Sequence, residues 1–154
     1  MSEKKKILWI EDDYYHLQGL TRELSRNGFE IISAKSYEQA LKKLNEYKEE
    51  LSFIILDLII PRSLERAIEP SFLEDEYEET IEEPKDLVEY GMELLNHIKN
   101  ELKPTIPMIV LTIVRTEEIL KELENNGVRK EHKLGLMPNK LKEIVFKELS
   151  LQSK

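Results

Sequence analysis

The chain contains no cysteine, which excludes disulfides, thiolate metal ligands and a cysteine nucleophile. No stretch is both long enough and apolar enough to span a membrane. The basic N-terminus meets acidic residues after four apolar positions, so it is not the pattern of a signal peptide. The three histidines, His16, His97 and His132, lack the spacing of metal ligands. At 154 residues the chain is long enough for one domain with a full core, and we expect it in the cytoplasm.

Basic residues are too few to balance the acids, and the imbalance is local. Residues 62–90 contain 11 acidic and 3 basic residues, a net charge of −8 that equals that of the whole chain. The other residues are balanced, with 20 acids and 20 bases. Nucleic acid and anionic membranes are poor partners for such a surface, so we expect protein partners instead.

A central buried strand is the clearest structural signal, in the sequence SFIILDLIIP of residues 52–61. Phe53 to Leu56 are apolar at consecutive positions, which indicates a parallel strand covered on both faces. Asp57 ends the run, and a carboxylate without a partner cannot remain in an apolar layer. We therefore expect Asp57 at the carboxyl edge of a sheet, where open α/β folds bind their ligands.

A second group of acids follows the first apolar run, residues 7–10. If the two runs are parallel neighbours, Glu11, Asp12 and Asp57 converge at one edge of the sheet. Three crowded carboxylates raise one another's pKa unless a cation lies among them, and hard oxygen ligands suit Mg²⁺. Asp13 is interpreted differently, as the N-cap or a first-turn acid of the helix that follows.

Strand and helix signals alternate along the rest of the chain, which predicts a parallel α/β sheet with helices on both faces. The predicted strands are residues 7–10, 29–34, 52–56, 108–112 and 133–137. The predicted helices are residues 14–27, 36–47, 86–99, 117–126 and 139–149, with Ser36 and Asn139 as caps.

Four motifs occur in a characteristic order: ILWIEDD, IILDLIIP, GMELLNHIK and IPMIVLT. With these motifs the chain resembles a response-regulator receiver domain of the CheY-like superfamily, over residues 1–154 apart from 62–85. The resemblance implies a doubly wound, flavodoxin-like sheet of five parallel strands in the order 2-1-3-4-5. It also implies a role in two-component phosphorelay signalling.

The resemblance assigns roles to the acids. Asp57 would accept a phosphoryl group from a sensor histidine kinase or a phosphotransfer protein. Mg²⁺ would be held by Glu11, Asp12, Asp57 and the backbone carbonyl of Ile59, and Thr112 would bind the phosphoryl oxygen. Beyond Mg²⁺-dependent self-phosphorylation at Asp57 from a phosphodonor, no conventional enzymatic activity is implied.

Three positions depart from the family pattern. The family has a lysine directly before the proline that follows strand five. Here that position is Met137, and a thioether cannot pair with a phosphoryl group. Lys133 and Lys140 are the two lysines that could reach the site instead. The residue after the threonine is Ile113, which would narrow access, and the aromatic switch position corresponds to Leu134.

Residues 62–85 form an acidic insertion, since Pro61 and Gly91 lie 30 positions apart where the family has a few residues. Its apolar residues are spaced for a short amphipathic helix, and a solvated loop is the alternative. These apolar residues are Phe72, Leu73, Tyr77 and Ile81. We predict a contact surface here for a basic partner, or for a basic patch on a second copy in a homodimer.

Two functions remain open at this point. One is a stand-alone receiver that accepts a phosphoryl group on Asp57 and acts on a downstream protein target, because the sequence ends soon after its last predicted helix. The other is a degenerate receiver that binds proteins without phosphorylation, which the substitution at Met137 favours. A Mg²⁺-dependent phosphatase would need an acid where Ile59 stands, and a dinucleotide site would need a glycine-rich loop after the first strand.

Overall fold

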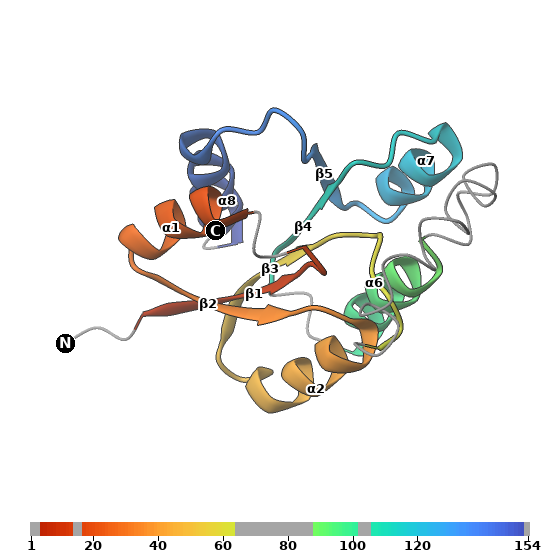
Figure 1. Ribbon diagram of the computed structural model, residues 1–154, viewed down its shortest axis with the longest axis horizontal. Coiled ribbons are helices and arrows are strands. Elements are labelled where there is room, and N and C mark those ends of the chain that lie inside the picture. The colour runs from red at the N-terminus through yellow and green to blue at the C-terminus, as the bar shows by residue number, and fades with distance from the viewer. Residues whose placement is uncertain (1–3, 14–16, 64–87, 102–105, 153–154) are drawn as a thin grey trace.

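One five-stranded parallel sheet forms the centre of the computed structural model, which describes residues 4–13, 17–63, 88–101 and 106–152. The strands are β1 (Lys5–Ile10), β2 (Phe29–Ala34), β3 (Leu51–Leu56), β4 (Met108–Thr112) and β5 (Arg129–His132). The helices are α1 (Gln18–Arg26), α2 (Tyr37–Tyr47), α6 (Glu89–Glu101), α7 (Glu117–Asn125) and α8 (Pro138–Gln152). The order β2-β1-β3-β4-β5 confirms the predicted topology (Figure 1).

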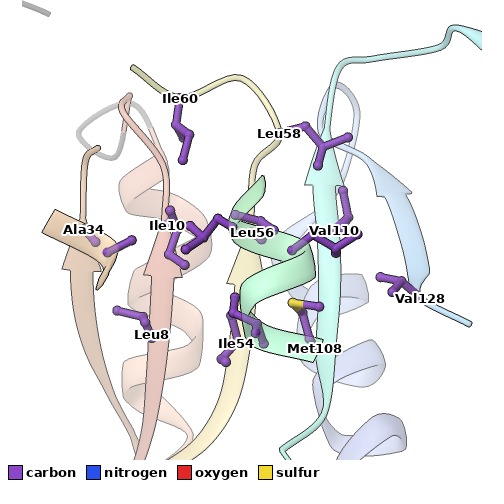
Figure 2. Close-up of a cluster of buried hydrophobic side chains, with 14 of the residues drawn as sticks. Leu8, Ile10, Ala34, Ile54, Leu56, Leu58, Ile60, Met108, Val110 and Val128 are labelled. Atoms are coloured by element: carbon purple, nitrogen blue, oxygen red, sulfur yellow. The ribbon is translucent and has the colours of Figure 1, made fainter. Parts of the chain in front are cut away.

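Two apolar cores lie on opposite faces of the sheet, because successive side chains of each strand alternate between the faces. Leu8 and Ile10 of β1 join the core beneath α2, α6 and α7, part of which is drawn in Figure 2. Ile7 and Trp9 join the core beneath α1 and α8, which lie together on the other side of the sheet (Figure 1). The consecutive apolar residues of β1 and β3 are therefore buried on both faces, as the sequence predicted.

Helix α6 packs directly against the backbone that follows β3 through Gly91. A Cβ atom added there would lie only 2.5 Å from the Cα of Leu58 and 2.6 Å from its carbonyl carbon. Such a separation is far inside van der Waals contact, so only glycine fits without moving the backbone. Because Leu58 follows Asp57, this packing sets the path of the chain at the end of β3.

Strand β5 differs from its prediction at residues 133–137. The strand is Arg129–His132, a polar edge strand that pairs with β4 from Ile109↔Arg129 to Thr112↔His132. The apolar sequence that follows is a turn, in which Gly135 has a φ of 82° and the Leu136 N–H donates to the Lys133 carbonyl at 3.5 Å. An edge strand needs no apolar run, since charged side chains suit its exposed position.

Two helix starts also differ from their predictions. Helix α1 begins at Gln18 with Leu17 at the N-cap and no capping side chain, so Asp13 is not its cap. Helix α8 begins at Pro138 and not after Asn139, and the Met137 carbonyl accepts from the Leu141 N–H at 3.1 Å. Proline is common at the first position of a helix, where its missing N–H has no partner to lose.

The N-terminus of α2 is capped from two directions. As predicted, the Ser36 hydroxyl accepts from the Gln39 N–H at 3.1 Å. The Tyr37 and Glu38 N–H groups donate to the carbonyls of Pro61 and Arg62 at 2.9 and 3.0 Å. The point where the chain enters its acidic segment is thereby fixed against α2.

The predicted helix or loop around Tyr77 lies outside the described residues, so the insertion at 62–85 stays a prediction. Among the helices of the described part of the chain, none combines the length and the apolar character needed to cross a membrane.

Candidate functional site

Three charged residues directly follow the ends of three strands: Glu11 after β1, Asp57 after β3 and Lys133 after β5. The N–H of each donates to the carbonyl of the last residue of an adjacent strand. The donor–acceptor distances are 2.9 Å from Glu11 to β2, 2.9 Å from Asp57 to β1 and 3.0 Å from Lys133 to β4. The sheet register therefore brings residues that are far apart in sequence to one edge.

Lys133 joins the two buried carboxylates. Its Nζ lies 2.9 Å from Asp57 Oδ2 and 2.8 Å from Glu11 Oε2. Glu11 is 0% exposed and Asp57 is 2% exposed, so these are ion pairs shielded from water. Of the two lysines that the sequence offers in place of Met137, Lys133 is the one that supplies the ammonium. Met137 is 66% exposed, and Lys140 lies exposed on α8.

A hollow of about 310 Å³ opens at this edge, lined by Glu11, Asp12, Asp13, Asp57, Ile59, Ile113 and Lys133. The carboxylates of Glu11, Asp12 and Asp57 lie within 4.8 Å of one another, which is the convergence that the sequence predicted. The Ile59 N–H donates to Asp57 Oδ1 at 3.2 Å and the Asp13 N–H to Glu11 Oε1 at 3.2 Å. These bonds hold the carboxylates in place.

Burial and the charge of neighbouring acids make the ionised forms of Glu11 and Asp12 unfavourable. Burial and then the negative charge of Asp57 raise the pKa of Glu11 to about 9, although Lys133 acts in the opposite direction. Desolvation likewise raises the pKa of Asp12. Burial lowers the pKa of Lys133, but the charge of Asp57 and the bonds to both acids outweigh it, and the net shift is upward.

A divalent cation fits this donor set. The three carboxylates supply only oxygen ligands, as Mg²⁺ prefers, and the one lysine ammonium leaves their negative charge only partly balanced. Glu11, Asp12 and Asp57 are the side chains that would hold the ion. The ligand role of the Ile59 carbonyl stays a prediction.

The other residues that the sequence singled out are Thr112, Ile113 and Leu134, and the structure places them in different surroundings. Thr112 is 2% exposed at the end of β4 and its Oγ1 accepts from the Val114 N–H at 3.3 Å. It lines a second hollow, with His132 and Arg115 among its neighbours, and does not line the acid hollow. Ile113 is 45% exposed and does line the acid hollow, whereas Leu134 is 70% exposed in the turn after Lys133.

Replacing Glu11 by glutamine should stabilise the metal-free protein at pH 8 by on the order of 2 kcal/mol. The folded-state pKa of Glu11, about 9, lies above the ordinary glutamate pKa of 4.5, so the unfolded chain loses this proton first and stability falls as pH rises between these values. Urea denaturation at pH 5 and pH 8 should show the gain of Glu11→Gln shrinking at the lower pH.

Mg²⁺ provides the second half of this experiment, because the ion should stabilise the wild type more than Glu11→Gln. Glu46→Gln, at an exposed acid on α2, is the matched control and should respond like the wild type. A gain independent of pH, or equal stabilisation of both proteins by Mg²⁺, would contradict a metal site at Glu11.

Comparison with known proteins gives one partial sequence match and several matches in fold. No protein-family model matches the chain. A stretch of 58 residues is 38% identical to the alkaline phosphatase synthesis transcriptional regulatory protein PhoP of Bacillus subtilis. The match covers 38% of this chain and 23% of that protein, so the chain matches less than a quarter of its curated relative's length.

Solved structures match over nearly the whole chain. A response regulator receiver domain protein from Clostridium thermocellum has a TM-score of 0.70 at 19% identity, covering 97% of both chains. A two-component response regulator from Clostridium difficile has a TM-score of 0.69 at 20% identity, covering 98% of this chain and 100% of that one. The BeF3-activated N-terminal receiver domain of Klebsiella pneumoniae RstA has a TM-score of 0.67 at 15% identity, covering 94% and 98%. The chain has the fold of response-regulator receiver domains.

Proposed function

We propose that this chain, with its receiver fold, accepts a phosphoryl group on Asp57 and passes the signal on through protein contacts. The donor would be the phosphohistidine of a sensor kinase or phosphotransfer protein, and the recipient of the signal a downstream protein. One observation carries the proposal: the Lys133 ammonium lies between Asp57 and Glu11 at 2.9 and 2.8 Å, beside a third carboxylate.

The chemistry follows from these contacts. An oxygen of the Asp57 carboxylate attacks the phosphorus, the phosphorus–nitrogen bond of the donor breaks, and its electron pair returns to the imidazole, leaving an acyl phosphate on Asp57. The Ile59 N–H holds Oδ1, and Lys133 beside Oδ2 can pair with the incoming phosphoryl oxygens. Mg²⁺, bound by Glu11, Asp12 and Asp57, would offset the negative charge of those oxygens.

Thr112 is proposed as a contact to the phosphoryl oxygen, since it ends the strand next to β3 at the same edge. The degenerate-receiver alternative drew its support from a missing lysine. Lys133 removes that support, while Ile113 still lines the entrance to the hollow. Phosphorylation is therefore the better supported of the two functions.

Intact-protein mass spectrometry after incubation with acetyl phosphate and Mg²⁺ tests this function. The wild type should gain the mass of one phosphoryl group, and hydroxylamine should remove it, because it cleaves acyl phosphates. Asp57→Asn should gain nothing, because an amide is a poor nucleophile.

Asp13→Asn is the matched control, since it removes an exposed acid of the same hollow, and it should still be phosphorylated. A wild type that gains no mass, or an Asp57→Asn variant that gains as much, would refute the assignment of Asp57.

A further inference from the structure

The side chain of His132, the last residue of β5, contacts two different loops. Arg115, in the loop between β4 and α7, donates from Nε to His132 Nε2 at 2.8 Å. The other ring nitrogen, Nδ1, lies 3.4 Å from the carbonyl oxygen of Leu134, in the turn after β5. Figure 1 shows β4 and β5 side by side. One ring therefore joins two segments that are separated in sequence by the whole of α7 and β5.

These two contacts determine where the His132 ring carries its proton. A guanidinium nitrogen can only donate, so Nε2, which faces Arg115, must be an unprotonated acceptor. A carbonyl oxygen can only accept, so Nδ1 carries the hydrogen that points to Leu134. The ring is therefore neutral and in a single tautomer, with a partner for each nitrogen.

Both bridged segments begin at a residue of the proposed phosphorylation site. The Thr112 loop, residues 113–116, follows Thr112 at the end of β4 and contains Arg115. The Lys133 turn, residues 133–137, begins with Lys133 and contains Leu134. The Lys133 N–H donates to the Thr112 carbonyl at 3.0 Å, which is the last backbone bond that aligns the two segments. The His132 ring connects them beyond that bond.

The charges around the ring leave it as the partner of Arg115. The ring adjoins a hollow of about 180 Å³ lined by Thr112, Val114, Arg115, Leu120, Lys130, Glu131 and His132. Helix α7 contributes only Leu120 to this hollow, and the one acid in it, Glu131, pairs with Arg129. Within the described part of the chain no carboxylate pairs with Arg115, so the neutral imidazole is what holds its guanidinium.

We propose that His132 is a positioning residue for phosphorylation of Asp57, an inference that rests on the proposed function. Its neutral ring holds the Thr112 loop and the Lys133 turn in one arrangement, so that both phosphoryl contacts are in place together. The ring itself does not touch the phosphoryl group. When its bond to Arg115 is broken, the two segments move independently and the productive arrangement is populated less often.

NMR spectra that correlate ring protons with ring nitrogens test the bond directly. At pH 8, where imidazoles are normally neutral, the wild type should show His132 protonated at Nδ1, and His132→Gln identifies the signal by removing it. Arg115→Met should shift the proton towards Nε2, because that nitrogen no longer has to accept. Lys130→Met removes a positive charge from the same hollow and should leave the tautomer unchanged. A wild-type ring protonated at Nε2 would overturn the proposal.

The rate of mass gain with acetyl phosphate and Mg²⁺ tests the consequence. His132→Leu and Arg115→Met should each slow phosphorylation about fivefold, and the double variant should be no slower than either, since both remove the same bond. His132→Gln should keep most of the rate, because its amide oxygen can accept from Arg115. Lys130→Met is the matched control and should react like the wild type.

The outcomes separate this role from the proposed function. Unchanged rates in Arg115→Met and His132→Leu, or additive losses in the double variant, would overturn the role of His132 alone. Equal losses in Lys130→Met and Arg115→Met would assign the effect to positive charge and overturn it too. Arg115 is exposed, so its replacement gives a folded protein even if His132→Leu does not fold. A wild type that gains no mass would instead refute phosphorylation of Asp57.

Discussion

Replacement of Lys133 by methionine should slow phosphorylation of Asp57 by acetyl phosphate on the order of a hundredfold. Lys133 is the one cation that contacts Glu11 and Asp57 among the described residues, and its side chain is 16% exposed. Methionine keeps a similar length and removes the charge, so the arriving phosphoryl group would lose its ammonium partner and meet carboxylates whose charge only the metal offsets. The rate of mass gain, measured with saturating Mg²⁺, reports the loss directly.

Lys140→Met is the matched control for this experiment, because it removes an exposed lysine from α8 and should leave the rate unchanged. Adding Met137→Lys to Lys133→Met should not restore the rate, since the side chain at position 137 is two-thirds exposed after the turn at Gly135. Thermal unfolding separates a folded, slow variant from an unfolded one. Full activity of folded Lys133→Met, or rescue by Met137→Lys, would contradict the role given to Lys133.

Gly91→Ala should lower the free energy of unfolding by about 3 kcal/mol. The added Cβ would clash with the backbone of Leu58, 2.5 Å from its Cα, and a backbone atom cannot move aside as the end of a side chain can. Either α6 withdraws from the sheet or the Leu58 backbone shifts, and both disturb buried packing. Urea denaturation measures the loss as a lower midpoint with an unchanged slope.

The same substitution in α1 gives the opposite result and serves as the control. Gly19 has no atom within 4 Å of an added Cβ, so Gly19→Ala should be neutral or stabilising by up to about 1 kcal/mol through helix propensity. Because Leu58 adjoins Asp57, Gly91→Ala should also weaken the response to Mg²⁺, which Gly19→Ala should not. Equal midpoints for the two variants would show that α6 can retreat at no cost.

The sheet could be predicted from the sequence because its interior strands are buried on both faces. The apolar runs of β1, β3 and β4 mark the positions that both cores require, and β2 was predicted with its observed bounds. The acids at the ends of β1 and β3 are equally visible in the sequence, since an acid that ends an apolar run must leave the core. Their convergence then follows from the pairing of these parallel strands.

Lys133 could be named only as one of two lysines within reach of the site, because β5 lacks the signal that revealed the other strands. Its sequence, RKEH, is polar, since the strand lies at the edge of the sheet, and its Arg129 pairs with Glu131 and Glu148. The apolar residues after it were mistaken for the strand. A better signal is loop length: Gly127 follows the end of α7, and the short connections of α/β folds place the next strand immediately afterwards. Counting from there puts Lys133, not Met137, at the strand's end.

The long sequence separation between Glu11, Asp57 and Lys133 also affects how the molecule matures during synthesis. The ribosome delivers β1 and β3 well before β5, so the two acids can dock while their ammonium partner has not yet emerged. Until β5 is in place, the edge of the nascent sheet carries the negative charges of Glu11 and Asp57. The positive charge of Lys133 reaches them only when these long-range contacts form. The acid hollow is therefore expected to be among the last regions to become native, and the arrival of β5 completes the sheet and brings the ammonium that offsets part of the negative charge.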